Sequence, residues 1–327
     1  MNKTYLINNV YVEGAATVVG PTEGAGPIGS YFDVVVPDNI YGESSWEKAE
    51  RKMLLESFGL CLKNTNYQPA DIDLILAGDL LNQLISANFA GRDIPVSFAG
   101  VFGACSTFAL SVGIGSLLID GGHMNRVMAA ACSHHETAER TYRFPTELGV
   151  QRPPTANWTM SGAGAVILGR QGTVAVKEVT LGRVVDYGIK DSTNLGAAMA
   201  PAAFDTLQLH LNNLGKKPED YDLIATGDLG SIGQICLKHL MGDASLGAGN
   251  LTDCGLQVYA TRQDTHAGAS GCAASACVFG SYFYPMLQKG ILKKILLIAT
   301  GALFGTTTAQ QKDSIPAVAH AIAFEKV

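Results

Sequence analysis

The chain has 327 residues, of which 47% are hydrophobic and only 16% are charged. This composition excludes a disordered chain and predicts a large buried interior, built from two domains or from two copies of one unit. The formal net charge of −6, without a cluster of lysine and arginine, argues against nucleic acid as a partner. The seven cysteines show no CxxC spacing and no signal peptide opens the chain, so we expect a reducing compartment.

The first half begins with a predicted helix. Ser44 and Glu47 have the spacing of a capping box, and apolar residues follow at helical spacing as far as Cys61. After this helix, Pro69 leads into a continuous apolar run that ends at Gly78. Such a run predicts a strand that is buried on both faces.

Residues 97–119 contain no charged side chain and are long enough to span a bilayer. The stretch is rich in glycine and serine, however, and Pro95 precedes it. We therefore expect a short strand, a glycine turn near Gly103 and a helix that is buried on all sides, as the core of a large protein requires.

The most informative feature is an internal repeat. Residues 69–80 (PADIDLILAGDL) recur without a gap as residues 218–229 (PEDYDLIATGDL). Gly103 and Gly122 recur as Gly271 and Gly290. The offset along the chain between these copies is larger than the offset between the first pair of repeated blocks, so the second half carries extra residues between its two blocks. These additions predict loops or short added helices.

The repeat predicts the fold. In each half a buried helix is followed by a strand, and a further helix in the second half ends at Gly215. Two such α/β halves, with both apolar helices packed between their sheets, form a five-layered αβαβα sandwich. We place the first half at residues 1–172 and the second at residues 173–327.

Cys105 is the candidate nucleophile, because a glycine turn delivers it to the start of the first buried helix. A helix N-terminus lowers the pKa of a thiol, although a small buried cysteine is the alternative. A nucleophilic cysteine needs a base, and His266 is the best placed histidine, shortly before Gly271. His134 begins a segment that we expect to be a solvated or ligand-facing loop rather than a metal site.

Three sets of residues carry a family resemblance. The repeated halves, the cysteine before the buried helix and residues 161–166 (SGAGAV) resemble the thiolase superfamily, which includes the type III ketoacyl synthases. More narrowly, the chain resembles the stage V sporulation protein AD family of endospore-forming bacteria. That resemblance is carried by residues 17–24 (TVVGPTEG), 137–147 (TAERTYRFPTE) and 155–162 (TANWTMSG).

The sequence departs from the working condensing enzymes of this fold. The resemblance places their catalytic histidine just after the second repeated strand, where this chain has Gly227 and Asp228. Their later catalytic residue falls near residues 265–270, and His266 is offset from it. An aspartate beside Cys105 raises the pKa of the thiol, so we expect no catalysis.

The sporulation resemblance implies non-catalytic binding of dipicolinic acid, free or with calcium, for uptake into the developing spore. Helix N-termini offer N–H donors to carboxylates, and arginines can bind them bidentately. The expected ligand-binding residues are Cys105, Ser106, His134, Arg140, Arg143, Asp228, His266, Gly271 and Cys272.

The resemblance also implies a place in the cell. It implies a soluble protein of the forespore that is peripheral to the inner membrane. The implied partners are other products of the stage V sporulation A operon, and a contribution to spore germination is implied as well. No cofactor or resident metal is expected. Enzymes of this fold commonly form homodimers, which makes a homodimer a candidate state of this chain. The alternative functions are an acyl-thioester condensing enzyme using Cys105 and a soluble scaffold for a membrane channel.

Overall fold

The computed structural model describes residues 3–142 and 152–327. The described helices are α1 Pro21–Gly24, α2 Trp46–Thr65, α3 Ile85–Arg92, α4 Thr107–Asp120, α5 His135–Tyr142, α6 Leu195–Leu214, α7 Gly230–Asp243, α8 Cys254–Val258, α9 Cys272–Val278, α10 Tyr284–Gln288 and α11 Thr306–Gln310. The described strands are β1 Thr4–Leu6, β2 Tyr11–Val19, β3 Val34–Val35, β4 Leu74–Gly78, β5 Phe98–Gly100, β6 Val127–Ser133, β7 Trp158–Thr159, β8 Gly162–Gly169, β9 Val174–Leu181, β10 Leu223–Thr226, β11 Leu251–Asp253, β12 Ala269–Ser270, β13 Lys294–Ala302 and β14 Ala317–Lys326.

The strands follow the same order in both halves of the chain. The first half is ordered β5-β4-β6-β8-β2 and the second β11-β10-β13-β14-β9. In each half the first three strands are parallel, and the last two join by antiparallel pairs. The two sets meet where Tyr11 of β2 pairs with Ala175 of β9. The proposed boundary at residues 172 and 173 lies between β8 and β9, and it stays a prediction.

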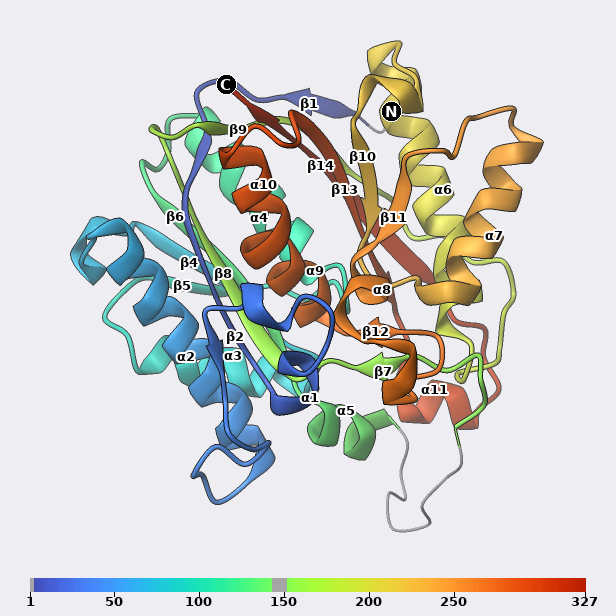
Figure 1. Cartoon of the computed structure of the whole chain (residues 1–327), viewed down its shortest axis with the longest axis horizontal. Coiled ribbons are helices and arrows are strands. Elements are labelled where there is room, and N and C mark those ends of the chain that lie inside the picture. The colour runs from blue at the N-terminus through green and yellow to red at the C-terminus, as the bar shows by residue number, and fades with distance from the viewer. Residues whose placement is uncertain (1–2, 143–151) are drawn as a thin grey trace.

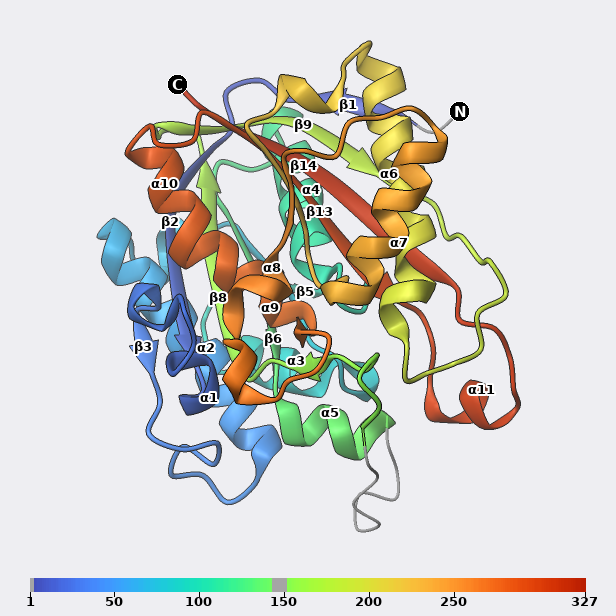
Figure 2. The same ribbon diagram turned by 45° about the vertical axis from the view of Figure 1, so that its right-hand side comes forward.

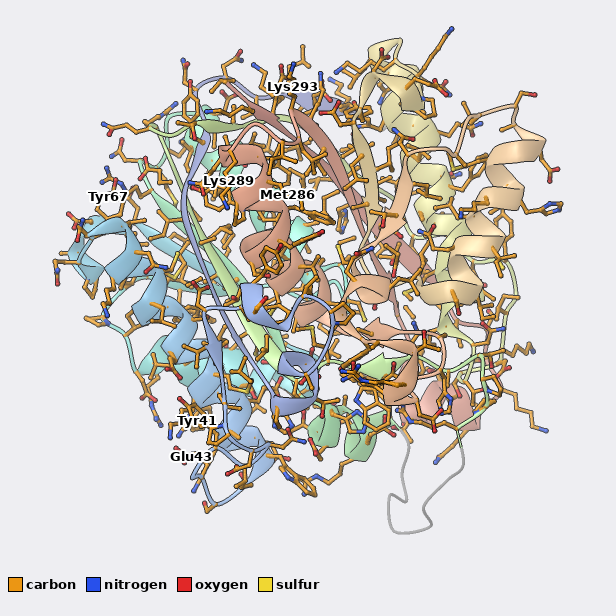
Figure 3. All side chains as sticks on the ribbon, viewed as in Figure 1. Tyr41, Glu43, Tyr67, Met286, Lys289 and Lys293 are labelled. Carbon is orange, nitrogen blue, oxygen red and sulfur yellow. The ribbon has the colours of Figure 1, made fainter. Side chains whose placement is uncertain are left out.

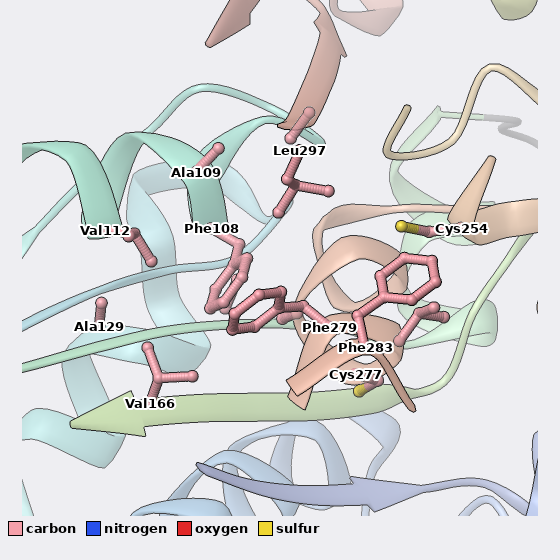
Figure 4. Close-up of a cluster of buried hydrophobic side chains, with 14 of the residues drawn as sticks. Phe108, Ala109, Val112, Ala129, Val166, Cys254, Cys277, Phe279, Phe283 and Leu297 are labelled. Carbon is pink, nitrogen blue, oxygen red and sulfur yellow. The ribbon is translucent and has the colours of Figure 1, made fainter. Parts of the chain in front are cut away.

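The buried helices α4 and α9 lie between the two sets of strands (Figures 1 and 2). Helix α4 contacts β4 and β6 of the first half and β13 and β14 of the second. Its Phe108 packs against Phe279, with ring centroids 5.9 Å apart, in the core that Figure 4 shows. Helices α2 and α3 cover one outer face, and α6 and α7 cover the other (Figure 1). This arrangement confirms the predicted five-layered thiolase-like sandwich.

Helix ends test the finer predictions from the sequence. Helix α2 is capped by Ser45, whose Oγ accepts a hydrogen bond from the Lys48 N–H, and so the expected cap at Ser44 is wrong by one residue. Tyr41 and Glu43, labelled in Figure 3, lie just before this helix on the surface of the molecule. Helix α6 ends at Gly215, which takes the left-handed conformation with φ of 64°, as predicted.

The uncharged stretch 97–119 forms strand β5, a turn and helix α4. Within residues 3–142 and 152–327, no helix is long and apolar enough to cross a membrane. The extra residues of the second half form α8 and β12, as short added elements. Strand β12 pairs with β7 of the first half, and the register places Ser270 opposite Thr159. This short ladder brings residues from both halves to the region of Cys105.

Candidate functional site

Cys105 is held in a tight turn just before α4. Ala104 has a φ of 48°, a left-handed conformation that is strained for a residue with a side chain. Strand β13 passes so close to this turn that a Cβ on Gly301 would overlap the Gly103 carbonyl oxygen. The turn is therefore fixed by the second half of the chain, and it leaves the Cys105 side chain buried, at 8% exposure.

A chain of polar side chains leads from Cys105 into the second half. The Cys105 sulfur lies 3.8 Å from Ser270 Oγ, and that hydroxyl lies 2.7 Å from Asp228 Oδ2. Asp228 also accepts hydrogen bonds from the Gly271 N–H at 3.1 Å and from Thr300 Oγ1 at 3.0 Å. A serine hydroxyl has one proton, and Ser270 donates it to Asp228. In the contact with Cys105 the thiol is therefore the donor and the Ser270 oxygen the acceptor.

These contacts keep Cys105 protonated. Burial raises the pKa of the Cys105 thiol well above its usual value, and the negative charge of Asp228 raises it further. Burial also raises the pKa of Asp228, and this effect outweighs the lowering of the pKa by the hydrogen bonds from Ser270 and the other donors. Cys105 is thus an uncharged thiol in the folded protein, and a helix N-terminus does not activate it.

A cavity of about 270 Å³ lies against Cys105. Its walls come from both halves of the chain and combine apolar side chains with hydroxyl and amide groups. The lining residues are Leu80, Ala104, Cys105, Ala138, Glu139, Tyr142, Asn157, Thr159, Ser192, Thr193, Leu195, Ser270, Ala302 and Phe304. Pockets that hold small molecules have volumes of about 300–1,000 Å³. This cavity lies just below that range, so it suits only a small ligand.

Asn157 contributes a polar group that lacks a partner. Its Nδ2 donates to the main-chain oxygen of Asp228 at 3.3 Å, whereas its Oδ1 is buried without a hydrogen bond. A buried polar atom without a partner costs free energy unless a bound molecule satisfies it. Asn157 is therefore a candidate contact for a ligand.

The helix starts do not offer the free N–H groups that the sequence suggested. The Gly271 N–H is taken by Asp228, and the N–H groups of Ser106 and Thr107 donate to the carbonyl oxygens of Gly103 and Ala104. The Ser106 hydroxyl also donates to the Gly103 carbonyl oxygen. Cys272 donates its thiol to the Cys132 carbonyl oxygen. Ser106, Gly271 and Cys272 do not line the cavity, and Asp228 lies behind its wall rather than on it.

The expected histidine base is also displaced. His266 has a φ of 53° and an exposed backbone, but its side chain is only 21% exposed, with Nδ1 3.7 Å from Asp264 Oδ1. It does not line the cavity, so it is not a base for Cys105 in this structure. None of the cavity-lining residues in the described part of the chain is a histidine.

His134 and Arg140 do not lie in a solvated loop. His134 is the single residue between β6 and α5 and is buried, with Nε2 2.8 Å from the Asn39 carbonyl oxygen and Nδ1 3.1 Å from Glu136 Oε2. Arg140 lies on α5, where it pairs with Glu47, and it does not line the cavity. The predicted loop is thus wrong at these positions, and Arg143 lies outside the described residues.

Sequence reasoning missed Ser270, Asn157, Tyr142 and Thr159, which all line the cavity. The one available signal was the position of Ser270 directly before the repeated Gly271. As to metals, the residues that the structure describes contain no group of three or more His, Cys, Asp or Glu side chains that could hold an ion.

Solved structures of condensing enzymes have the same fold. The 3-oxoacyl-(acyl-carrier-protein) synthase III from Aquifex aeolicus superposes with a TM-score of 0.60 at 14% identity, over 97% of this chain and 99% of that one. Cerulenin-bound OleA from Xanthomonas campestris gives a TM-score of 0.61 at 14% identity, over 97% and 98% of the two chains. The chain therefore has the thiolase-like fold of the ketoacyl synthase III type.

The sequence comparison is narrower. The family model described as stage V sporulation protein AD matches residues 2–325. The stage V sporulation protein AD of Bacillus subtilis (strain 168) is 43% identical over 319 residues, which are 97% of this chain and 94% of that protein. The chain belongs to the stage V sporulation protein AD family.

Proposed function

We propose that the protein acts in sporulation by binding dipicolinic acid in the cavity beside Cys105, without catalysis, for uptake of the acid into the developing spore. The observation that carries this proposal is the cavity itself. It ends at a cysteine whose polar neighbours are Ser270 and Asp228 rather than an imidazole. The site thus offers a cavity for a small ligand beside a thiol that stays neutral.

The absence of catalysis follows from proton transfer. An attacking cysteine must lose its proton to a base, and a developing oxyanion needs donors aimed at it. Asp228 accepts from Ser270, Gly271 and Thr300 and raises the pKa of Cys105. These groups therefore disfavour the thiolate that a condensation requires.

The chemistry of the walls supports a small aromatic acid. The Thr159 and Ser192 hydroxyls line the cavity and can donate to carboxylate oxygens, as can the second Nδ2 proton of Asn157. Thr193 also lines the cavity, but its hydroxyl donates to Asp191 Oδ1 at 2.6 Å. The rings of Tyr142 and Phe304, whose centroids are 5.3 Å apart and whose planes are tilted by 38°, provide an aromatic wall. Calcium, if it accompanies the ligand, would neutralise its two carboxylates and find oxygen donors in these walls.

The cellular part of the proposal rests on the family. We place the protein at the inner membrane of the forespore, as a peripheral partner of other products of the stage V sporulation A operon. Homodimerisation and a contribution to germination belong to this proposal as well.

The first test is calorimetric titration with dipicolinate, picolinate and isophthalate, each with and without calcium. Dipicolinate should bind at least tenfold more tightly than picolinate, because the loss of one charged contact costs about 1–3 kcal/mol. Equal affinity for the three acids would contradict a site built for this ligand. No binding of any of them would favour a scaffold with an unused cavity.

One rival function has an observation of its own. The relay from Cys105 through Ser270 to Asp228 could serve acyl transfer if Asp228 acted as a base. Incubation with acetyl- and longer acyl-coenzyme A, followed by intact mass measurement, separates the two. We expect no thioester, and a thioester that disappears in Cys105→Ala would establish the enzyme instead.

A further inference from the structure

The wall of the cavity carries a charge of the wrong sign for an acid. Glu139 is the one charged side chain among the described residues that line the cavity. Asp228, a second carboxyl group, lies directly behind Ser270. An anionic ligand would be repelled by both groups unless a cation stood close to them.

Arg152 is that cation. Its Nη2 forms an ion pair with Glu139 Oε1, and the two side chains are only 10% and 16% exposed. Its Nη1 donates to the main-chain oxygen of Asn157 at 2.8 Å, directly beside the unpartnered side-chain oxygen of that residue. The guanidinium is thus fixed behind the two polar residues of the wall.

Aromatic stacking holds Arg152 in place on its other side. The guanidinium lies 4.8 Å from the Trp158 ring centroid, and Trp158 in turn stacks on His135 at 3.9 Å and 9°. Burial lowers the pKa of Arg152 to about 10, which leaves the group charged at neutral pH. Burial first, and then the charge of Arg152, lower the pKa of His135 to about 4, so His135 adds no second cation.

We propose that Arg152 is the specificity-determining residue that allows an anionic ligand to occupy the cavity, and that a ligand carboxylate takes the place of Glu139 on its guanidinium. This inference rests on the proposed function, which it deepens. A guanidinium presents a planar fork of donors that matches one carboxylate at a time, so Glu139 and the ligand compete for it. Glu139 keeps the buried cation paired while the cavity is empty.

The test uses two substitutions with opposite expected effects. Arg152→Met removes the guanidinium that pairs with Glu139 and should weaken dipicolinate binding at least tenfold. Glu139→Gln removes the competing carboxylate and should tighten binding severalfold. A merely structural role for the ion pair would weaken binding in both variants, so weakening in both would overturn the proposal.

A second readout separates this proposal from the proposed function. Cys105 in each variant is alkylated with iodoacetate and with iodoacetamide at pH 8.5, and the two rates are measured by peptide mass. The ratio of the alkylation rate with anionic iodoacetate to the rate with neutral iodoacetamide should fall severalfold in Arg152→Met and rise in Glu139→Gln, whether or not dipicolinate binds. An unchanged ratio would contradict the role of Arg152, whereas shifted ratios without dipicolinate binding would contradict only the proposed ligand.

Two further variants serve as controls for misfolding. Arg152→Lys keeps the charge but loses the fork, so it should retain most of the alkylation ratio and lose part of the affinity for dipicolinate. The double variant of Arg152→Met with Glu139→Gln leaves no unpaired charge, and its ratio should lie between those of the single variants. If the double variant folds and its ratio matches that of Arg152→Met alone, the competition between Glu139 and the ligand is excluded. If neither reagent reaches Cys105 and no variant binds dipicolinate, both proposals fail.

Discussion

The Ser270 hydroxyl donates to Asp228 Oδ2 across 2.7 Å, and the same Ser270 oxygen lies 3.8 Å from the sulfur of Cys105. Ser270 comes from β12, whereas Cys105 comes from the turn before α4, so the contact joins the two halves of the chain. The bond determines the character of the site, because it places a carboxyl group where deprotonation of the thiol is opposed.

The first prediction concerns this bond. Ser270→Ala removes one donor from a buried carboxyl group and should lower the free energy of unfolding by about 1–3 kcal/mol. Ser275→Ala is the matched control, since Ser275 on α9 is equally buried but its Oγ has no hydrogen-bond partner. The control should cost less than about 1 kcal/mol in the same urea titration. Equal losses of unfolding free energy in the two variants would show that the hydrogen bond to Asp228 does not stabilise the fold.

A second prediction fills the cavity. Ala138 on α5 lines the cavity and is 3% exposed, so Ala138→Leu places three carbon atoms in the space that we assign to the ligand. Dipicolinate binding should fall at least tenfold with little change in thermal stability, because the added carbons enter open space. Ala70→Leu, at an exposed position far from the cavity in sequence, should leave binding unchanged. Unchanged affinity in Ala138→Leu would place the ligand elsewhere.

The third prediction concerns acid stability. Burial acts to raise the pKa of Glu178, but hydrogen bonds from His210, Lys216 and Tyr221 outweigh it and lower this pKa to about 2. Because the folded pKa lies below the unfolded value near 4.5, this stability is present above pH 4.5 and is lost as the pH falls towards 2. The loss amounts to about 2–3 kcal/mol. Glu178→Gln should lose less over this range in urea titrations, and an identical loss would contradict the assignment.

The fourth prediction has the opposite sign. Burial and the charge of Asp79 raise the pKa of Glu50 to about 8. The folded state then binds more protons than the unfolded state between about pH 4.5 and 8, so stability falls as the pH rises through that range. Glu50→Gln mimics the protonated acid and should show a smaller fall between pH 5 and 8. A fall as steep as in the wild type would mean that Glu50 is ionised in the folded protein.

Much of the fold could be predicted because its signals are local. The repeated run at residues 69–80 and 218–229 marked β4 and β10, and Gly215 marked the end of α6. The cap of α2 was displaced by one residue because Ser44 and Ser45 are adjacent and either hydroxyl can serve. Helix α5 was missed because it is only eight residues long and mostly polar, so that few apolar residues mark its buried face.

The site was harder to predict because it depends on long-range geometry. Cys105 and Asp228 could be found, since each stands at the end of a repeated element. Ser270 and Asn157 could not, because serine and asparagine are common residues and the ladder of β7 with β12 brings them to Cys105. His266 was proposed from its distance along the chain, but a left-handed turn carries it to the surface.

The most direct test is a crystal grown with dipicolinate and examined by difference density. We expect a flat ligand in the cavity beside Cys105, with one carboxylate near Arg152 and the Asn157 side chain and no bond to the sulfur. Density for dipicolinate at another place on the protein, or an empty cavity in crystals grown at a saturating concentration of the ligand, would contradict the account.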